Sequence, residues 1–153
     1  MTSPTPNPVA ARDQAQRLEA LGRVPREVFG LLADSKTPLK AYELLWRLQA
    51  KRGRRAPPTT IYRALATLIE AGLAHRIESL GAFVVCATPN TSHDPIFLLC
   101  EQCGEALETN LGSMAQSVTK HVERAGFQVR RLNFIVRGRC SICRPVDELQ
   151  DQL

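Results

Sequence analysis

Two pairs of cysteines, each separated by two residues, are the clearest chemical feature of this 153-residue sequence. Cys100 and Cys103 lie in LLCEQCG, and Cys140 and Cys143 lie in GRCSICRP. Four thiolates in two such pairs can hold one tetrahedral Zn(II), because each short turn sets two sulfurs at adjacent corners. The same residue types can also form disulfides or a redox couple.

The expected redox compartment favours the metal over the disulfides. The N-terminus lacks the basic head and apolar stretch of a secretory signal, and no apolar run reaches the roughly 18 residues of a membrane span. We therefore expect a cytoplasmic protein, whose thiols are kept reduced. A helix and a strand between the two pairs would return the chain to the first pair. The sequence thus predicts a permanent structural zinc at Cys100, Cys103, Cys140 and Cys143.

The fifth cysteine, Cys86, suggests a second metal site. In a hairpin centred between Leu80 and Gly81, the paired residues sum to 161, which sets His75 opposite Cys86. His93 and Glu108 are further candidate ligands close by in the sequence. A buried apolar role for Cys86 and a hydrogen-bonded wing role for His75 remain the alternatives.

Helices followed by a hairpin precede the cysteine pairs. Helical patterns cover roughly 10–21, a stretch from Pro25, a stretch from Thr37 as N-cap to Gly53, and 58–71, which Gly72 closes. Two strands then flank the expected turn. This order is typical of a winged helix-turn-helix, and the helix at 58–71 is its candidate recognition helix.

Charge is divided unevenly along the chain. Residues 1–76 hold 13 Lys/Arg against 6 Asp/Glu, a net charge of +7, whereas residues 77–153 hold 7 against 9, a net charge of −2. Arg63 lies in the second turn of the candidate recognition helix. A basic cluster at the entry to this helix comprises Arg47, Lys51, Arg52, Arg54 and Arg55. The alternatives are DNA contact and a solvated helix face, and the winged-helix order favours DNA.

The remaining sequence predicts a small α/β domain. It contains a short apolar strand in IFLLCE, a helix over roughly 112–125 that ends at Gly126, and an alternating strand in FQVRRLNFIVRG. We expect an α+β protein with a winged-helix domain at 1–86, a hinge linker at 87–94 and a dimerisation and structural zinc domain at 95–153.

Together these motifs resemble the ferric uptake regulator (Fur) family of metal-responsive repressors. The stretches PPTTIYRALATLIEAGLAHRIESLGAFVVC and HDPIFLLCEQCG are most similar to its zinc-responsive branch, Zur. The resemblance implies a homodimer that binds palindromic operators of zinc-uptake genes when a regulatory Zn(II) is bound, and no enzymatic activity. It assigns the structural zinc to the four paired cysteines and the regulatory zinc to His75, Cys86, His93 and Glu108, which makes two ions per protomer.

The resemblance also implies DNA contacts from Tyr42, Tyr62 and Arg63. The same region offers further candidates in Lys40, Arg55, Thr59 and Thr60. Two alternatives use the same residues: a regulator of this fold that senses iron, manganese or peroxide, and a zinc hydrolase with Glu108 as general base. The sequence has no HExxH pattern, which disfavours the hydrolase.

Overall fold

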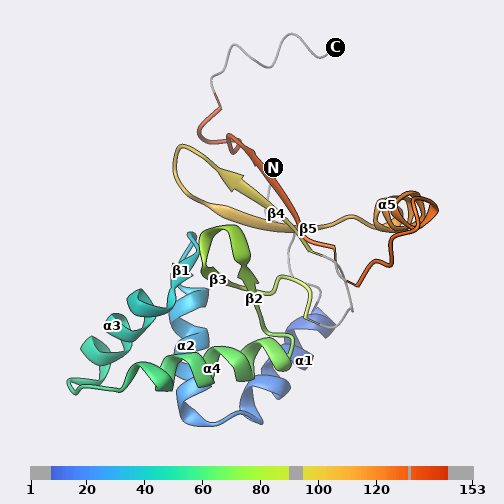
Figure 1. The fold of residues 1–153 in the computed structure, drawn as a ribbon. Helices are drawn as coiled ribbons and strands as arrows, with labels where there is room; N and C mark the ends of the chain where they lie inside the picture. The colour runs from blue at the N-terminus through green and yellow to red at the C-terminus, as the bar shows by residue number, and fades with distance from the viewer. Residues whose placement is uncertain (1–7, 90–94, 131, 145–153) are drawn as a thin grey trace. The chain divides into compact units, whose positions relative to one another are not determined.

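The computed structural model describes residues 8–89, 95–130 and 132–144, which form two units (Figure 1). Apolar residues at helical spacing build the first unit. The division between the units falls between Thr91 and Ser92. The first unit contains α1 (Pro8–Glu19), α2 (Arg23–Ala33), β1 (Leu39–Lys40), α3 (Ala41–Arg52), α4 (Pro58–Glu70), β2 (Ala74–Ile77), a 3₁₀ turn (Glu78–Leu80) and β3 (Ala82–Val85).

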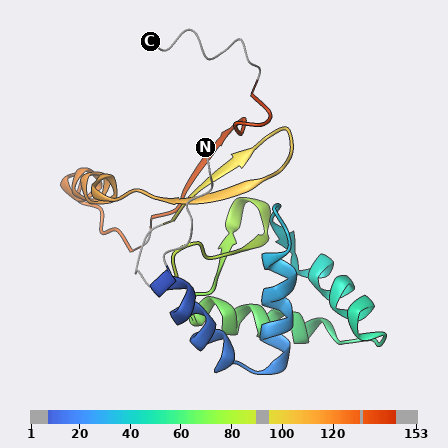
Figure 2. The ribbon, with the colours of Figure 1, turned by 180° about the vertical axis from the view of Figure 1, so that it is seen from behind.

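The core of this unit lies between α2, α3 and α4. On α4, Ile61, Ala64, Leu65 and Leu68 are buried at the i, i+3, i+4, i+7 spacing of one helix face. The buried face meets apolar side chains of α2 and α3, which include Val28, Leu32, Leu44 and Leu48. In the reverse view, α1 and α2 lie in front of α4 (Figure 2). The exposed face of α4 is therefore held on a continuous core.

Glycine closes α3 and α4 where the sequence predicted. Gly53 and Gly72 follow the two helices with φ of 63° and 68°. This left-handed conformation is easy for glycine and costly for residues with a Cβ atom.

Among the described residues, none of the helices combines the length and apolar character needed to cross a bilayer.

The predicted start of α3 was wrong. The helix begins at Ala41 rather than at Pro38, because Leu39 and Lys40 pair with Phe83 and Ala82 as the third strand of the sheet, in the order β1-β3-β2. The side chain of Glu43 accepts a hydrogen bond of 2.7 Å from the backbone N–H of Lys40 and caps the helix. Thr37 is therefore not the N-cap.

The wing turn also differs from the prediction. A 3₁₀ turn at Glu78–Leu80 and Gly81, with φ of 57°, connect β2 to β3. The loop thus spans four residues and is centred one residue earlier than expected. His75 pairs with Val84, so its predicted direct pairing with Cys86 was wrong.

The second unit contains β4 (Pro95–Cys100), β5 (Ala106–Asn110), α5 (Ser113–Arg124) and β6 (Phe134–Gly138). The central strand β4 runs antiparallel to β5 and parallel to β6. The predicted alternating strand was too long, since residues 127–130, 132 and 133 lie outside β6. The buried hydrophobic residues described in this unit are Phe97, Leu99 and Cys100, which make a much smaller core than that of the first unit.

Candidate metal centres and nucleic-acid interface

Parallel pairing of β4 and β6 brings the two cysteine pairs together. Cys100 ends β4 opposite Gly138, the last residue of β6, so the chain reaches Cys140 two residues beyond the same edge of the sheet. The backbone N–H of Glu101 donates to the carbonyl of Gly138 at 2.8 Å and continues this pairing. Strands that run in the same direction therefore deliver both turns to one place.

The two CxxC turns have the same backbone pattern. The N–H of Gly104 donates to the carbonyl of Cys100, and the N–H of Arg144 donates to the carbonyl of Cys140, each at 2.9 Å. The backbone N–H of Cys140 also approaches the sulfur of Cys100 at 3.4 Å. Each turn thus presents two sulfurs on one side, and one turn supports a sulfur of the other.

The spacing of the four sulfurs fits tetrahedral zinc. The sulfurs of Cys100, Cys103, Cys140 and Cys143 all lie within 4.8 Å of one another, and none is in a disulfide. Zn–S bonds of about 2.3 Å imply tetrahedral S–S edges of about 3.8 Å. The sulfurs of Cys103 and Cys140 lie 3.8 Å apart. Four thiols at this spacing can hold one tetrahedral Zn(II) with no open position.

The ionisation of these thiols points to the same conclusion. Hydrogen bonds from the backbone of Cys103, and then from that of Cys140, lower the pKa of Cys100 to about 6. The side chain of Cys140 and the burial of the thiol raise the pKa of Cys143 to about 12. Cys100 therefore forms a thiolate readily, whereas the thiolate of Cys143 needs a cation to offset its burial and the neighbouring sulfurs.

His75 and Cys86 lie together despite the error in the predicted register. Their ligand atoms are within 4.8 Å of one another, and Cys86 is buried. The N–H of Cys86 donates to the carbonyl of Leu73 at 3.0 Å and extends the pairing of β2 with β3, which together are called the ribbon. His75 and Cys86 are therefore diagonal neighbours on one face of the ribbon. A thiolate and an imidazole at this spacing suit Zn(II).

The other two predicted ligands of this site belong to different parts of the chain. Glu108 is a half-buried residue of β5 and pairs with Phe97 in the second unit. His93 lies outside the described residues.

The exposed face of α4 carries most of the candidate DNA contacts. Tyr62 is 61% exposed, and Thr59 and Arg63 are also exposed, whereas Thr60 is half-buried. These residues occupy the first two turns of the helix and are not among its buried residues Ile61, Ala64, Leu65 and Leu68. Hydroxyl, phenol and guanidinium groups there can bind phosphates and base edges.

Three further candidates lie outside α4. Lys40 ends β1 and is exposed, Tyr42 begins α3 and is 67% exposed, and Arg55 is exposed in the segment between α3 and α4. Arg52 has a different role. Its Nε donates to the carboxylate of Glu27 at 2.7 Å, and its side chain is only 11% exposed. Arg52 is a brace between α3 and α2, which residue type alone did not reveal.

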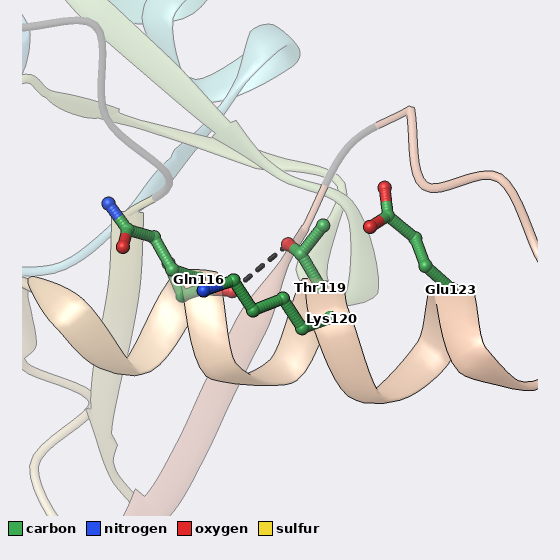
Figure 3. Close-up of a pocket in the computed structure, with 5 residues that line it drawn as sticks. Gln116, Thr119, Lys120 and Glu123 are labelled. Atoms are coloured by element: carbon green, nitrogen blue, oxygen red, sulfur yellow. Dashed lines mark hydrogen bonds between the residues drawn. The ribbon is translucent and has the colours of Figure 1, made fainter.

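A shallow hollow of about 290 Å³ runs along α5 (Figure 3). Its lining comes from that helix alone and comprises Ala115, Gln116, Thr119, Lys120 and Glu123. The hydroxyl of Thr119 donates to the carbonyl of Ala115 at 3.0 Å, as in Figure 3. A hollow on one face of a single helix lacks the converging walls of a small-molecule site.

Known proteins similar to this chain are metal-responsive regulators. No protein-family model matches the chain. The zinc uptake regulation protein of Escherichia coli (strain K12) is 29% identical over 134 residues, which cover 87% of this chain and 78% of that protein. The solved zinc uptake regulator complexed with zinc and DNA matches with a TM-score of 0.78 at 26% identity, over 92% of this chain and 96% of that one.

The crystal structure of holo XcZur matches with a TM-score of 0.73 and covers 88% of this chain. Because the identity is 32% over 97% of that regulator, the chain belongs to the zinc uptake regulator (Zur) branch of the ferric uptake regulator family.

Proposed function

We propose that this protein is a zinc-dependent transcriptional repressor that binds palindromic operators of zinc-uptake genes as a homodimer. The observation that carries this proposal is the similarity, over 92% of the chain, to a regulator solved with zinc and DNA. The exposed polar face of α4 and the clustered thiols are the features that such a function needs.

DNA recognition is assigned to the exposed face of α4. Tyr62 and Arg63 reach the major groove, and Thr59 and Thr60 contact phosphates near the N-terminus of the helix. Lys40, Tyr42 and Arg55 contact the backbone on either side. The net charge of +7 on residues 1–76 favours approach to a polyanion.

Zinc regulation is assigned to His75 and Cys86 on the ribbon, completed by His93 and Glu108. One thiol, two imidazoles and one carboxylate form a ligand set that suits Zn(II) better than iron or manganese. Bound by these four residues, Zn(II) supplies a cross-link between the wing, the linker and β5. With the four-cysteine site, this makes two ions per protomer.

A homodimer explains the apolar surface of the second unit. None of the twelve residues of α5 is buried, although Ala115, Val118 and Val122 form an apolar face. Leu107 of β5 and Val136 of β6 are also exposed, by 46% and 52%. A twelve-residue helix is marginal in water without tertiary packing, so a second copy of the chain is the proposed cover.

The central experiment measures operator affinity against buffered free zinc. We expect affinity to rise about 5–150-fold with zinc, the usual range for coupled binding sites. Arg63→Ala should weaken binding at saturating zinc while zinc content stays unchanged. Arg26→Ala, which removes an exposed arginine of α2, is the matched control. Affinity that stays flat across zinc concentrations would contradict the proposed sensor.

An enzymatic role is not proposed. The similar proteins reported above are regulators, and the four-cysteine site has no open position for substrate. Glu108 is therefore assigned to metal binding rather than to general-base catalysis.

A further inference from the structure

Arg17 of α1 connects two chain segments that flank the metal-ligand pair of the ribbon. Its Nη1 donates to the carbonyl of Pro89 at 3.0 Å and lies 3.3 Å from the carbonyl of Ala71. Ala71 is the C-cap of α4, and Pro89 is a buried residue at the end of the described part of the first unit. One guanidinium nitrogen thus binds both the C-terminal end of the candidate recognition helix α4 and Pro89, where the chain leaves the described part of the first unit.

The position of these two carbonyls in the chain gives the contact its meaning. The chain leaves α4 at Ala71 and enters the ribbon that carries His75, then returns through Cys86 and leaves at Pro89. The bond from the N–H of Cys86 to the carbonyl of Leu73 extends the pairing toward this open end. Arg17 thus bonds the two chain segments at the open end of the ribbon: the segment that joins α4 to β2 and the segment that follows Cys86.

The surroundings of the guanidinium favour this geometry. Asp13, one helical turn earlier, lies 3.4 Å from Nη2 and orients the side chain. The carbonyl of Ala71 is at the negative end of the α4 dipole, where a cation is stabilised. At Gly72, an added Cβ would lie 3.6 Å from both Nη1 of Arg17 and the carbonyl oxygen of Pro89, which is ordinary van der Waals contact, so both groups lie next to this glycine.

We infer that Arg17 is a positioning residue that couples the regulatory metal site to the recognition helix. This inference rests on the proposed function. A metal site that includes linker residues can orient α4 only if the linker leaves the winged-helix unit in a fixed direction. Arg17 fixes that direction by bonding Pro89 and the C-terminal end of α4 with the same group.

The test is the ratio of operator affinity at saturating zinc to that with chelator. In Arg17→Ala we expect this ratio to fall at least threefold, with zinc content and chelated affinity unchanged. Arg17→Lys should give an intermediate ratio, because an ammonium keeps the charge but lacks the planar fork. Arg12→Ala removes the same charge from an exposed position of the same helix and should keep the wild-type ratio.

An unchanged ratio in Arg17→Ala, or an equal fall in Arg12→Ala, would overturn the inference. If Arg17→Ala does not fold, the lysine variant decides, since a wild-type ratio there would also overturn it. Wild-type protein without any zinc dependence would instead overturn the proposed function, and this inference with it. A zinc-dependent wild type with an unaffected Arg17→Ala isolates the failure to the coupling role.

Discussion

Two of the four clustered cysteines, Cys100 and Cys143, have pKa values shifted in opposite directions. Backbone hydrogen bonds lower the pKa of Cys100 to about 6, whereas the side chain of Cys140 raises the pKa of Cys143 to about 12. Such a set ionises fully only around a cation, and the free energy of metal binding then becomes free energy of folding. Cys86 is a buried residue of the other unit, directly after β3.

Serine substitutions should separate the two roles of cysteine. We expect Cys100→Ser to unfold the second unit or to dissociate the dimer, because the structural site loses a ligand. We expect Cys86→Ser to leave a folded dimer that has lost zinc-dependent operator binding. Circular dichroism, sedimentation and operator titration on both variants are the measurements. Similar outcomes for the two variants would show that the thiols have been assigned to the wrong sites.

The sequence revealed which residue types meet at these sites, but not every pairing. CxxC spacing is a local signal, so the four-thiol cluster was predictable from the chain. The predicted direct pairing of His75 with Cys86 was wrong, because a four-residue turn with a 3₁₀ segment moved the hairpin centre by one residue and paired His75 with Val84. That error changed the partner sum by two and kept both side chains on one face, since strand side chains alternate with period two.

Helices and strands differed in how far local sequence determined them. The bounds of α4 were predicted within one residue, because Pro58 and Gly72 punctuate the chain around a clear apolar stripe. The strand β1 was missed, because Leu39 and Lys40 are extended only through pairing with β3, more than forty residues later. This long-range pairing overrode the local helix-start signal at Thr37 and Pro38, and the helix begins at Ala41 instead.

The brace between α2 and α3 supports a prediction at the scale of elements. Hydrogen bonds from Arg52, and then from Arg23, lower the pKa of Glu27, whose carboxylate they share. Glu27→Gln should lower the free energy of unfolding by about 1–3 kcal/mol at pH 7, as expected for a hydrogen bond between charged groups. Urea unfolding of the wild type and the variant is the measurement.

The sign of the shift fixes the pH window of this effect. A lowered folded-state pKa contributes stability that is present above the unfolded-state value and is lost as pH falls through the lowered one. The difference between wild type and Glu27→Gln should therefore be constant from pH 6 to pH 8. Glu19→Gln, at an exposed position of α1, is the control and should change stability little. A difference that disappears between pH 8 and pH 6 would contradict the assigned ion pairs.

At the scale of the whole molecule, burial among the described residues is concentrated in the first unit, the winged-helix unit. In the described part of the second unit, the buried hydrophobic residues are Phe97, Leu99 and Cys100. Units with so small a core usually depend on a metal or a partner for stability. The proposed metal site and the proposed dimer contact would supply this stability. The arrangement of two copies could not be predicted from the sequence, because it depends on contacts between chains rather than on local patterns.

A substitution on α5 tests the proposed dimer. Val118→Glu places a charge on the apolar face and should weaken dimerisation at least tenfold, which corresponds to about 1.4 kcal/mol. Gln116→Glu adds the same charge at an exposed position of the same helix and should leave the dimer intact. Sedimentation equilibrium of the zinc-loaded proteins measures both. Equal dimerisation of the two variants would move the interface away from α5.

The parallel pairing of β4 with β6 also sets the order of events during protein synthesis. All strands and helices of the winged-helix unit precede residue 90, so this unit can fold while later residues are still being translated. The sheet of the second unit has to wait for β6, and its thiol cluster has to wait for Cys143. A nascent chain on the ribosome can therefore fold its winged-helix unit before its four-cysteine cluster can assemble.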